Sequence, residues 1–163
     1  MGKKFLSLLL GIIMLLGISM NAVAISGNAN ENATATQTII YLEDGNYIVI
    51  TPYENSILTR STVYYKSGGR IITFYDNDGN KMWQVDFDVT FKVTEGVSAT
   101  CTAASFSAPI IYDDSWRYIT NSVSKNGSSA SGTITMKKYF LGLPIRTEKP
   151  TITVTCDKYG NLT

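Results

Sequence analysis

The longest regular pattern in the chain runs from residue 83 to residue 93. Apolar and polar side chains alternate there without a break, in the order Trp83, Gln84, Val85, Asp86, Phe87, Asp88, Val89, Thr90, Phe91, Lys92 and Val93. Because successive side chains of a strand point to opposite faces, this pattern predicts a long strand with one dry face and one wet face. A helix would spread the same apolar residues around its whole surface. The chain is therefore expected to be a β-protein whose core lies on the dry face of this strand.

Shorter segments that either alternate in the same way or are runs of β-branched and aromatic residues between turn residues lie on both sides of this strand. They predict strands at residues 38–43, 47–51, 61–66, 71–75, 97–103, 116–124, 129–140 and 151–156. Turns are predicted at residues 44–46, 67–69, 76–80, 94–96, 126–127 and 142–144. The Asp44-Gly45 and Asn126-Gly127 pairs are the clearest hairpin signals, because a type I′ turn needs positive φ. Residues 52–60 are expected to form a connector, and residues 104–115 to cross from one sheet to another.

Turn residues recur about every ten residues, and no segment has a helical period. This spacing predicts one all-β domain at residues 38–163, an antiparallel β-sandwich or small barrel of about 7–9 strands. Many of the predicted strands are rich in Ser and Thr on the face opposite their apolar side chains. Such faces are typical of sheets that are wet on one side.

The first 24 residues have the pattern of an export signal. Lys3 and Lys4 precede an apolar run at residues 5–20, and Ala22-Val23-Ala24 forms a small-residue cleavage site. A membrane-spanning helix is the alternative, but the run is short for a span of about 20 residues and no basic cluster follows it. Cleavage after Ala24 predicts a secreted, extracellular protein. Residues 25–37 are expected to be a flexible tail because they lack apolar periodicity.

Charge excludes some partners. The chain after Ala24 carries 12 basic and 13 acidic groups, a net charge of −1. This balance gives no footprint for nucleic acid or for an anionic membrane. No later segment is apolar enough to span a bilayer, so no membrane association is expected after signal cleavage.

The two cysteines, Cys101 and Cys156, both fall on the apolar phase of their predicted strands. Because an exported chain meets an oxidising environment, an even pair predicts one disulfide. Two separate buried thiols are the alternative. A disulfide closing a loop of this length would stabilise the fold by about 4 kcal/mol.

The chain contains no histidine, which removes the common catalytic triads and imidazole metal sites. No catalytic, cofactor-binding or metal-binding residues are predicted, and no cofactor is implied. Asp76, Asp78 and Asn80 match the start of a calcium loop, but its later positions hold Lys81 and Phe87, so a hairpin turn is preferred. Asp86 and Asp88 share the wet face of their strand and could serve as paired carboxylates for glycan hydrolysis, although solvated charges that protect an exposed sheet face are the preferred interpretation.

The chain has ten tyrosines, several of them on polar phases of predicted strands. Exposed aromatic rings can stack on sugars or anchor a protein partner, whereas tyrosine is also an ordinary strand residue. The candidate ligand-facing residues are Tyr64, Tyr118 and Tyr139.

From Tyr64 onward the chain resembles a group of small exported proteins of Gram-positive bacteria with no assigned activity. The resemblance covers about 100 residues. It lies in the order of five features: the alternating strand with Trp83, Ser-Ala-Thr-Cys around Cys101, Trp116, the hairpin at residues 124–127, and Thr-Cys-Asp-Lys-Tyr-Gly-Asn-Leu at residues 155–162. It implies export and a β-fold, and it carries no site residues.

The sequence therefore favours a secreted, non-enzymatic binding module at the bacterial cell surface, with a surface glycan or a protein as its partner. A secreted bacteriocin-like antagonist is one alternative. A carboxylate-dependent glycan hydrolase is another.

Overall fold

The computed structural model describes residues 36–55 and 61–163. Ten strands lie in these residues, and no helix does. The strands are β1 (Thr38–Tyr41), β2 (Tyr47–Asn55), β3 (Val63–Tyr75), β4 (Lys81–Thr94), β5 (Ser98–Phe106), β6 (Ile110–Ile111), β7 (Trp116–Asn126), β8 (Ser129–Phe140), β9 (Leu143–Glu148) and β10 (Thr151–Thr155). The prediction of an all-β protein is confirmed, with more strands than the 7–9 expected.

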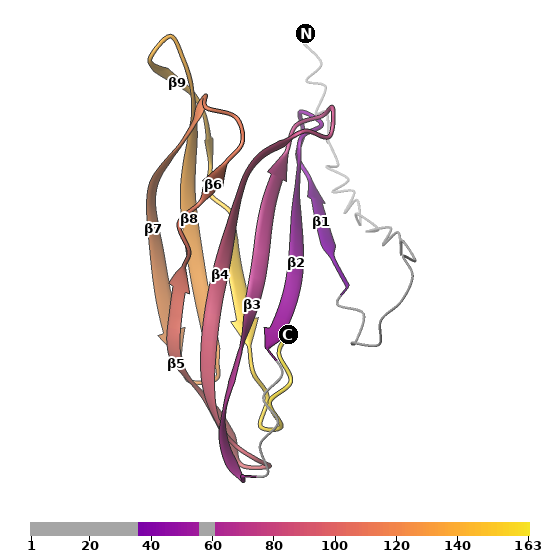
Figure 1. The fold of residues 1–163 in the computed structure, drawn as a ribbon, viewed down its shortest axis with the longest axis vertical. Coiled ribbons are helices and arrows are strands. Elements are labelled where there is room, and N and C mark those ends of the chain that lie inside the picture. Colours follow the sequence, from indigo (N-terminus) through magenta and orange to yellow (C-terminus); the bar gives the residue numbers. More distant parts are fainter. Residues whose placement is uncertain (1–35, 56–60) are drawn as a thin grey trace, which may run out of the picture.

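The strands form two antiparallel sheets, seen as two layers in Figure 1. Sheet A has six strands in the order β1-β2-β3-β4-β5, and the short β6 pairs with β4 beyond the end of β5. Sheet B has four strands in the order β10-β8-β7, and β9 also pairs with β8. The chain crosses from sheet A to sheet B between β6 and β7, within the segment predicted to make that crossing.

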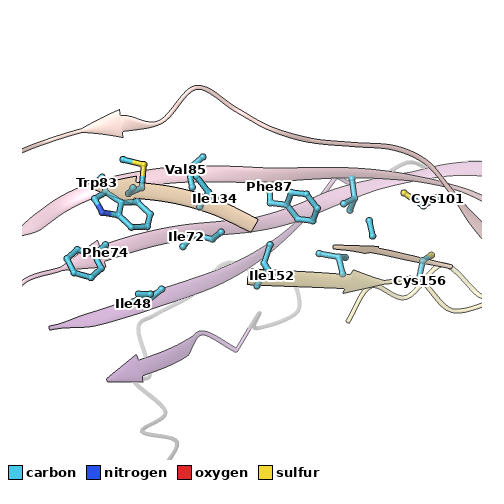
Figure 2. Packing of buried hydrophobic residues seen from close by; sticks show 14 of the residues in the cluster. Ile48, Ile72, Phe74, Trp83, Val85, Phe87, Cys101, Ile134, Ile152 and Cys156 are labelled. Carbon is cyan, nitrogen blue, oxygen red and sulfur yellow. The ribbon is translucent and has the colours of Figure 1, made fainter. Parts of the chain in front are cut away.

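The two sheets share one apolar core. Strand β4 supplies its centre, because Trp83, Phe87 and Phe91 on the dry face are completely buried. Ile134 and Met136 of β8 complete the core from sheet B and are equally buried (Figure 2). The alternation at residues 83–93 therefore predicted both the strand and the side of it that is dry.

An aromatic cluster fills one end of the core. The ring of Phe74 stacks on Trp83 with centroids 5.5 Å apart, and Trp116 of sheet B packs against Phe74 at 5.0 Å. Arg146 of β9 covers the cluster, with its guanidinium 5.1 Å from the Phe74 ring centroid. Arg146 also pairs with Glu148 at 2.6 Å and with Asp44 in the β1–β2 turn. This arginine therefore links sheet B to the edge of sheet A.

The prediction of a turn at residues 67–69 is wrong. Gly68 and Gly69 lie inside β3, which runs unbroken from Val63 to Tyr75. Both glycines are needed for close packing rather than for a bend. A Cβ at Gly68 would lie 2.7 Å from Leu162 Cδ1, and a Cβ at Gly69 would overlap the Phe87 carbonyl oxygen.

The turn predicted at residues 142–144 is also shifted. Leu141 and Gly142 form the turn, with φ values of 49° and 80°, and Pro144 belongs to β9. No strand was predicted at β9, because the segment has only six residues and its proline argues against a central strand. Pairing with β8 shifts register beside this proline.

The predicted disulfide is not formed, and both cysteines are buried free thiols. They sit at the same end of the core, since the Cys101 amide donates to the Gly127 carbonyl and the Cys156 amide to the Ser128 carbonyl. Their strands belong to different sheets, and each sulfur lies near a carbonyl of its own segment, Cys101 Sγ being 3.3 Å from the Ala103 oxygen. Burial raises the pKa of both thiols, that of Cys156 to about 11. The two residues therefore behave as small core side chains.

Residues 156–163 close the core beyond β10. Cys156 forms a β-bridge with Leu162, and the Thr155 and Thr163 backbones exchange two hydrogen bonds of 2.9 and 3.0 Å. This arrangement folds Leu162 back against the core cluster beneath Gly68.

The predicted signal with its Ala24 cleavage site, and most of the predicted tail, lie outside the described residues. Within the part of the chain that the structure describes, no helix is long and apolar enough to cross a membrane.

Candidate functional site

Side chains of four strands converge on the outer face of sheet A. Because Ile48, Ile72 and Val85 point into the core, strand alternation places their neighbours on the opposite face. The antiparallel register then aligns these neighbours across β1, β2, β3 and β4. One resulting row contains Tyr41, Tyr47, Tyr75 and Lys81, and the next contains Ile39, Val49, Thr73 and Gln84.

A shallow groove of about 420 Å³ crosses these rows. Its walls come from all four strands: Gln37, Ile39, Tyr47, Val49, Thr51, Ile71, Thr73, Tyr75, Lys81 and Gln84. The volume lies within the range usual for small-molecule sites. The groove is open along the sheet, which suits an extended ligand better than an enclosed one.

Three tyrosines form a continuous aromatic row at one end of the groove. The Tyr47 and Tyr75 rings are stacked, with centroids 4.9 Å apart and planes only 6° from parallel. Tyr41 packs on the other side of Tyr47 at 5.7 Å and is 72% exposed, so it keeps an accessible ring surface. Such rings combine an apolar face with a hydroxyl group.

Amide and hydroxyl groups lie along the rest of the groove. Gln37 Nε2 donates to Thr51 Oγ1 at 3.1 Å, and the Thr73 hydroxyl donates to Gln84 Oε1 at 3.4 Å. These contacts fix the two carboxamides in position. Lys81, the one charged residue of the lining, has its Nζ 5.9 Å from the ring centroid of Tyr112.

Asp86 and Asp88 lie beside the groove on the same outer face. The hydroxyl of Tyr53 donates to Asp88 Oδ1 across the bare backbone of Gly69. Burial, with this hydrogen bond and the Asp88 charge, raises the pKa of Tyr53 well above its usual range. Burial and the Asp88 charge also raise the pKa of Asp86. The two carboxyl groups are therefore held in different environments.

The three tyrosines selected from the sequence lie away from this groove and apart from one another. Tyr64 lies on the inner side of β3, where its hydroxyl donates to the Tyr159 carbonyl at 2.9 Å. Tyr118 accepts a hydrogen bond from Asn121 Nδ2 at 2.9 Å, and Tyr139 lies under the Arg117 guanidinium at 5.1 Å. Their role as ligand contacts stays a prediction.

The calcium-like loop is a hairpin turn. Asp76 Oδ1 accepts from the Asp78 and Asn80 amides at 3.0 and 2.7 Å, and Asp76 Oδ2 accepts from Asn80 Nδ2 at 2.9 Å. Both oxygens of the carboxylate are therefore used by the turn itself. No group of three or more cysteine and acidic side chains that could hold a metal ion occurs at residues 36–55 or 61–163.

Sequence reasoning missed the groove, although its signals were present. Tyr41 and Tyr47 flank the Asp44-Gly45 turn symmetrically, so a tight hairpin had to place them as a pair. Tyr75 stands at the same distance from its own turn. What the sequence could not give was the order β1-β2-β3, which brings the third ring beside the other two.

Comparison with known proteins gives no relatives. No family model matches the chain, no curated protein is similar to it, and no solved structure matches its fold.

Proposed function

We propose that the protein is a secreted, non-enzymatic module that binds a surface glycan in the groove on the outer face of sheet A. The observation that carries the proposal is the combination of the Tyr41–Tyr47–Tyr75 row with two ordered carboxamides on one open face. The export signal predicted at residues 1–24 supports placing that face outside the cell.

Sugar rings have apolar faces and a rim of hydroxyl groups. The exposed Tyr41 ring suits the apolar face, and the amides of Gln37 and Gln84 suit the hydroxyl groups. Lys81 is the one charged residue of the lining, which favours a polysaccharide of low charge over a phosphate-rich polymer.

Glycan hydrolysis is the second candidate. A raised pKa at Asp86 beside a hydrogen-bonded Asp88 resembles the division of labour in glycosidases, where one carboxyl is an acid and the other is ionised. However, both residues project from one strand and lie side by side under any ligand. Hydrolysis needs carboxyl groups on two sides of the scissile bond, so binding is preferred.

The test is retention on purified peptidoglycan, chitin and cellulose, followed by titration calorimetry with soluble fragments of whichever polymer retains the protein. We expect Tyr47→Ala and Gln84→Ala each to weaken binding tenfold or more, since both side chains line the groove. Asp86→Asn and Asp88→Asn should leave binding within a few-fold.

The matched control is Tyr65→Ala. Tyr65 is an exposed tyrosine of the same face of β3, but ten residues, or roughly 33 Å, from Tyr75. The Tyr65→Ala variant should bind the polymer as tightly as the unaltered protein does. Equal loss in Tyr65→Ala and Tyr47→Ala, or no retention on any of the polymers, would contradict the proposal. Release of reducing sugar that disappears in Asp86→Asn would instead favour hydrolysis.

A further inference from the structure

The hairpin between β8 and β9 has an apolar tip. Four large apolar side chains cluster there, with exposed fractions of 64% for Phe140, 87% for Leu141, 68% for Leu143 and 60% for Ile145. The hairpin extends beyond the neighbouring turns at its end of the molecule (Figure 1). The groove of sheet A includes none of these residues, so the tip is a separate surface.

The backbone at the tip is also unusual. Leu141 has φ of 49° and is the single non-glycine residue with positive φ at residues 36–55 and 61–163. Four of the other five turns with a positive-φ glycine have an acidic or amide residue before it: Asp44-Gly45, Asp78-Gly79, Glu95-Gly96 and Asn126-Gly127. An exposed leucine in a strained backbone conformation does not stabilise the folded protein in water. Such an outlier indicates a role in binding.

Basic and aromatic side chains lie directly below the tip. In the strand register, Lys138 of β8 lies opposite Arg146 of β9, and Lys137 of β8 lies opposite Arg117 of β7 on the outer face of sheet B. Lys138 and Arg146 are engaged by Asp113, Asp44 and Glu148, but neither Arg117 nor Lys137 forms an ion pair with a described residue. The Tyr139 ring packs against the Arg117 guanidinium at this level. Moving away from the tip, apolar side chains are therefore followed by a level that holds aromatic and cationic side chains together.

Net charge and the lack of a further apolar span predicted no membrane association, but neither reports on a local surface. From the tip we propose that the β8–β9 hairpin inserts into the interfacial layer of an anionic lipid membrane. Leu141 is three residues from Lys138 along β8, which is about 10 Å at 3.3 Å per residue. Interfacial segments bury their apolar side chains about 5–10 Å deep, so insertion of the tip would bring Arg117 and Lys137 to the headgroups. Tyrosine and basic side chains are typical of that level of a bilayer.

A membrane fits this surface better than a protein pocket does. The four side chains are all more than half exposed around one hairpin turn, whereas hot spots of a protein interface are a few anchors that fill pockets of the partner. The cations Arg117 and Lys137 match anionic headgroups, and the acids Asp113, Asp44 and Glu148 are already engaged by Lys138 and Arg146. The inference does not depend on glycan binding, because it uses different residues.

The experiment is co-sedimentation with vesicles of phosphatidylcholine alone and of phosphatidylcholine mixed equally with phosphatidylglycerol. We expect binding to the anionic vesicles that falls at least tenfold in Leu141→Asn, since a buried leucine side chain contributes a factor of this order. Asparagine followed by glycine is a favoured type I′ pair, so this variant keeps the hairpin. Arg117→Gln with Lys137→Gln should weaken binding to the anionic vesicles and reduce its salt dependence.

The matched control is Val97→Asn. Val97 is 73% exposed and follows Gly96 in the β4–β5 turn, far along the chain from the tip. It should bind vesicles like the unaltered protein. Absence of binding to the anionic vesicles would overturn the proposal. Binding that survives Leu141→Asn, or falls equally in Val97→Asn, would overturn it too.

Discussion

At the scale of single residues, the strain at Leu141 has a consequence for stability. A residue with a Cβ loses roughly 1–2 kcal/mol in the left-handed region, and asparagine tolerates this region better than leucine does. We therefore expect Leu141→Asn to raise the free energy of unfolding by about 0.5–1 kcal/mol, measured by urea denaturation. Val97→Asn removes a similarly exposed apolar side chain without relieving a positive φ and should change stability by less than about 0.5 kcal/mol. Destabilisation by Leu141→Asn would contradict the description of this turn.

Two turns share the pattern Asp-x-x-Gly-Asn, at residues 76–80 and 157–161. Each aspartate accepts hydrogen bonds from the asparagine side chain and from turn amides, and these bonds lower the pKa of both Asp76 and Asp157. A lowered pKa in the folded state means that the ionised form stabilises the fold above the unfolded value of 3.8. That contribution is lost as the pH falls through the folded pKa.

Stability should therefore fall between about pH 4 and pH 2, and the fall should be shallower in the double variant Asp76→Asn with Asp157→Asn. The measurement is the free energy of unfolding across this range. Asp78→Asn is the control. The backbone amide of Asp78 donates a hydrogen bond within the turn, whereas its carboxylate accepts none from a described residue. A double variant that keeps the full slope would contradict the assignment.

At the scale of elements, β3 depends on its two glycines. Gly69 lets the Tyr53 side chain cross the strand, with the hydroxyl only 2.8 Å from where a Cβ would lie. Gly69→Ala should lower the free energy of unfolding by roughly 3 kcal/mol, because the new methyl group overlaps the Phe87 carbonyl and displaces Tyr53 from Asp88. Thermal and denaturant unfolding would measure this loss.

The control exchanges glycine and alanine at an uncrowded strand position. Ala103 is an exposed residue of β5. Ala103→Gly should lower the free energy of unfolding by no more than about 1 kcal/mol, the intrinsic difference between these residues. A Gly69→Ala variant as stable as the unaltered protein would show that the strand can shift to make room.

The elements also show how far the sequence could be interpreted. Strand β4 was predictable because every position from Trp83 to Val93 follows the two-residue period and the apolar face is buried. Strand β3 was broken into two by its Gly68-Gly69 pair, because glycine in a sequence is a turn signal and the partner that crowds it is distant. Strand β9 was missed because Pro144 and its neighbours pair with β8 through an irregular register.

At the scale of the whole molecule, Arg146 is a charged side chain that joins the two sheets at the aromatic end of the core, where Trp116 also packs on Phe74. It packs on Phe74 and pairs with both Glu148 and Asp44. Replacing it by methionine should lower the free energy of unfolding by about 1–2 kcal/mol, because Asp44 and Glu148 lose their partner although the core stays covered. The hydrogen bond from Arg146 is the main reason that the pKa of Asp44 is lowered, so the variant should also lose part of the stability present above pH 3.8.

Lys149→Met is the control for this prediction. Lys149 is an exposed cation that follows the same strand and forms no ion pair with a described residue. Its replacement should leave stability nearly unchanged at every pH. Equal effects of the two variants would mean that Arg146 acts through net charge alone.

The candidate site belongs to this scale too, which is why it could not be predicted. The individual tyrosines and glutamines are visible in the sequence, but their convergence depends on strand order and on the register of four strands. Cys101 and Cys156 show the same limit. Their phase placed them both in the core, yet the position of each sulfur depends on how the two sheets face one another.

The return of residues 151–163 to the core has a consequence for the timing of folding. Ile152 and Val154 fill the space between the sheets, and Leu162 lies beneath Gly68 of β3. A chain emerging from a ribosome or a translocation channel cannot complete this interior until those residues have emerged. The space between the sheets can therefore be filled only after the last strand and Leu162 are available, so the core is completed at the end of the chain.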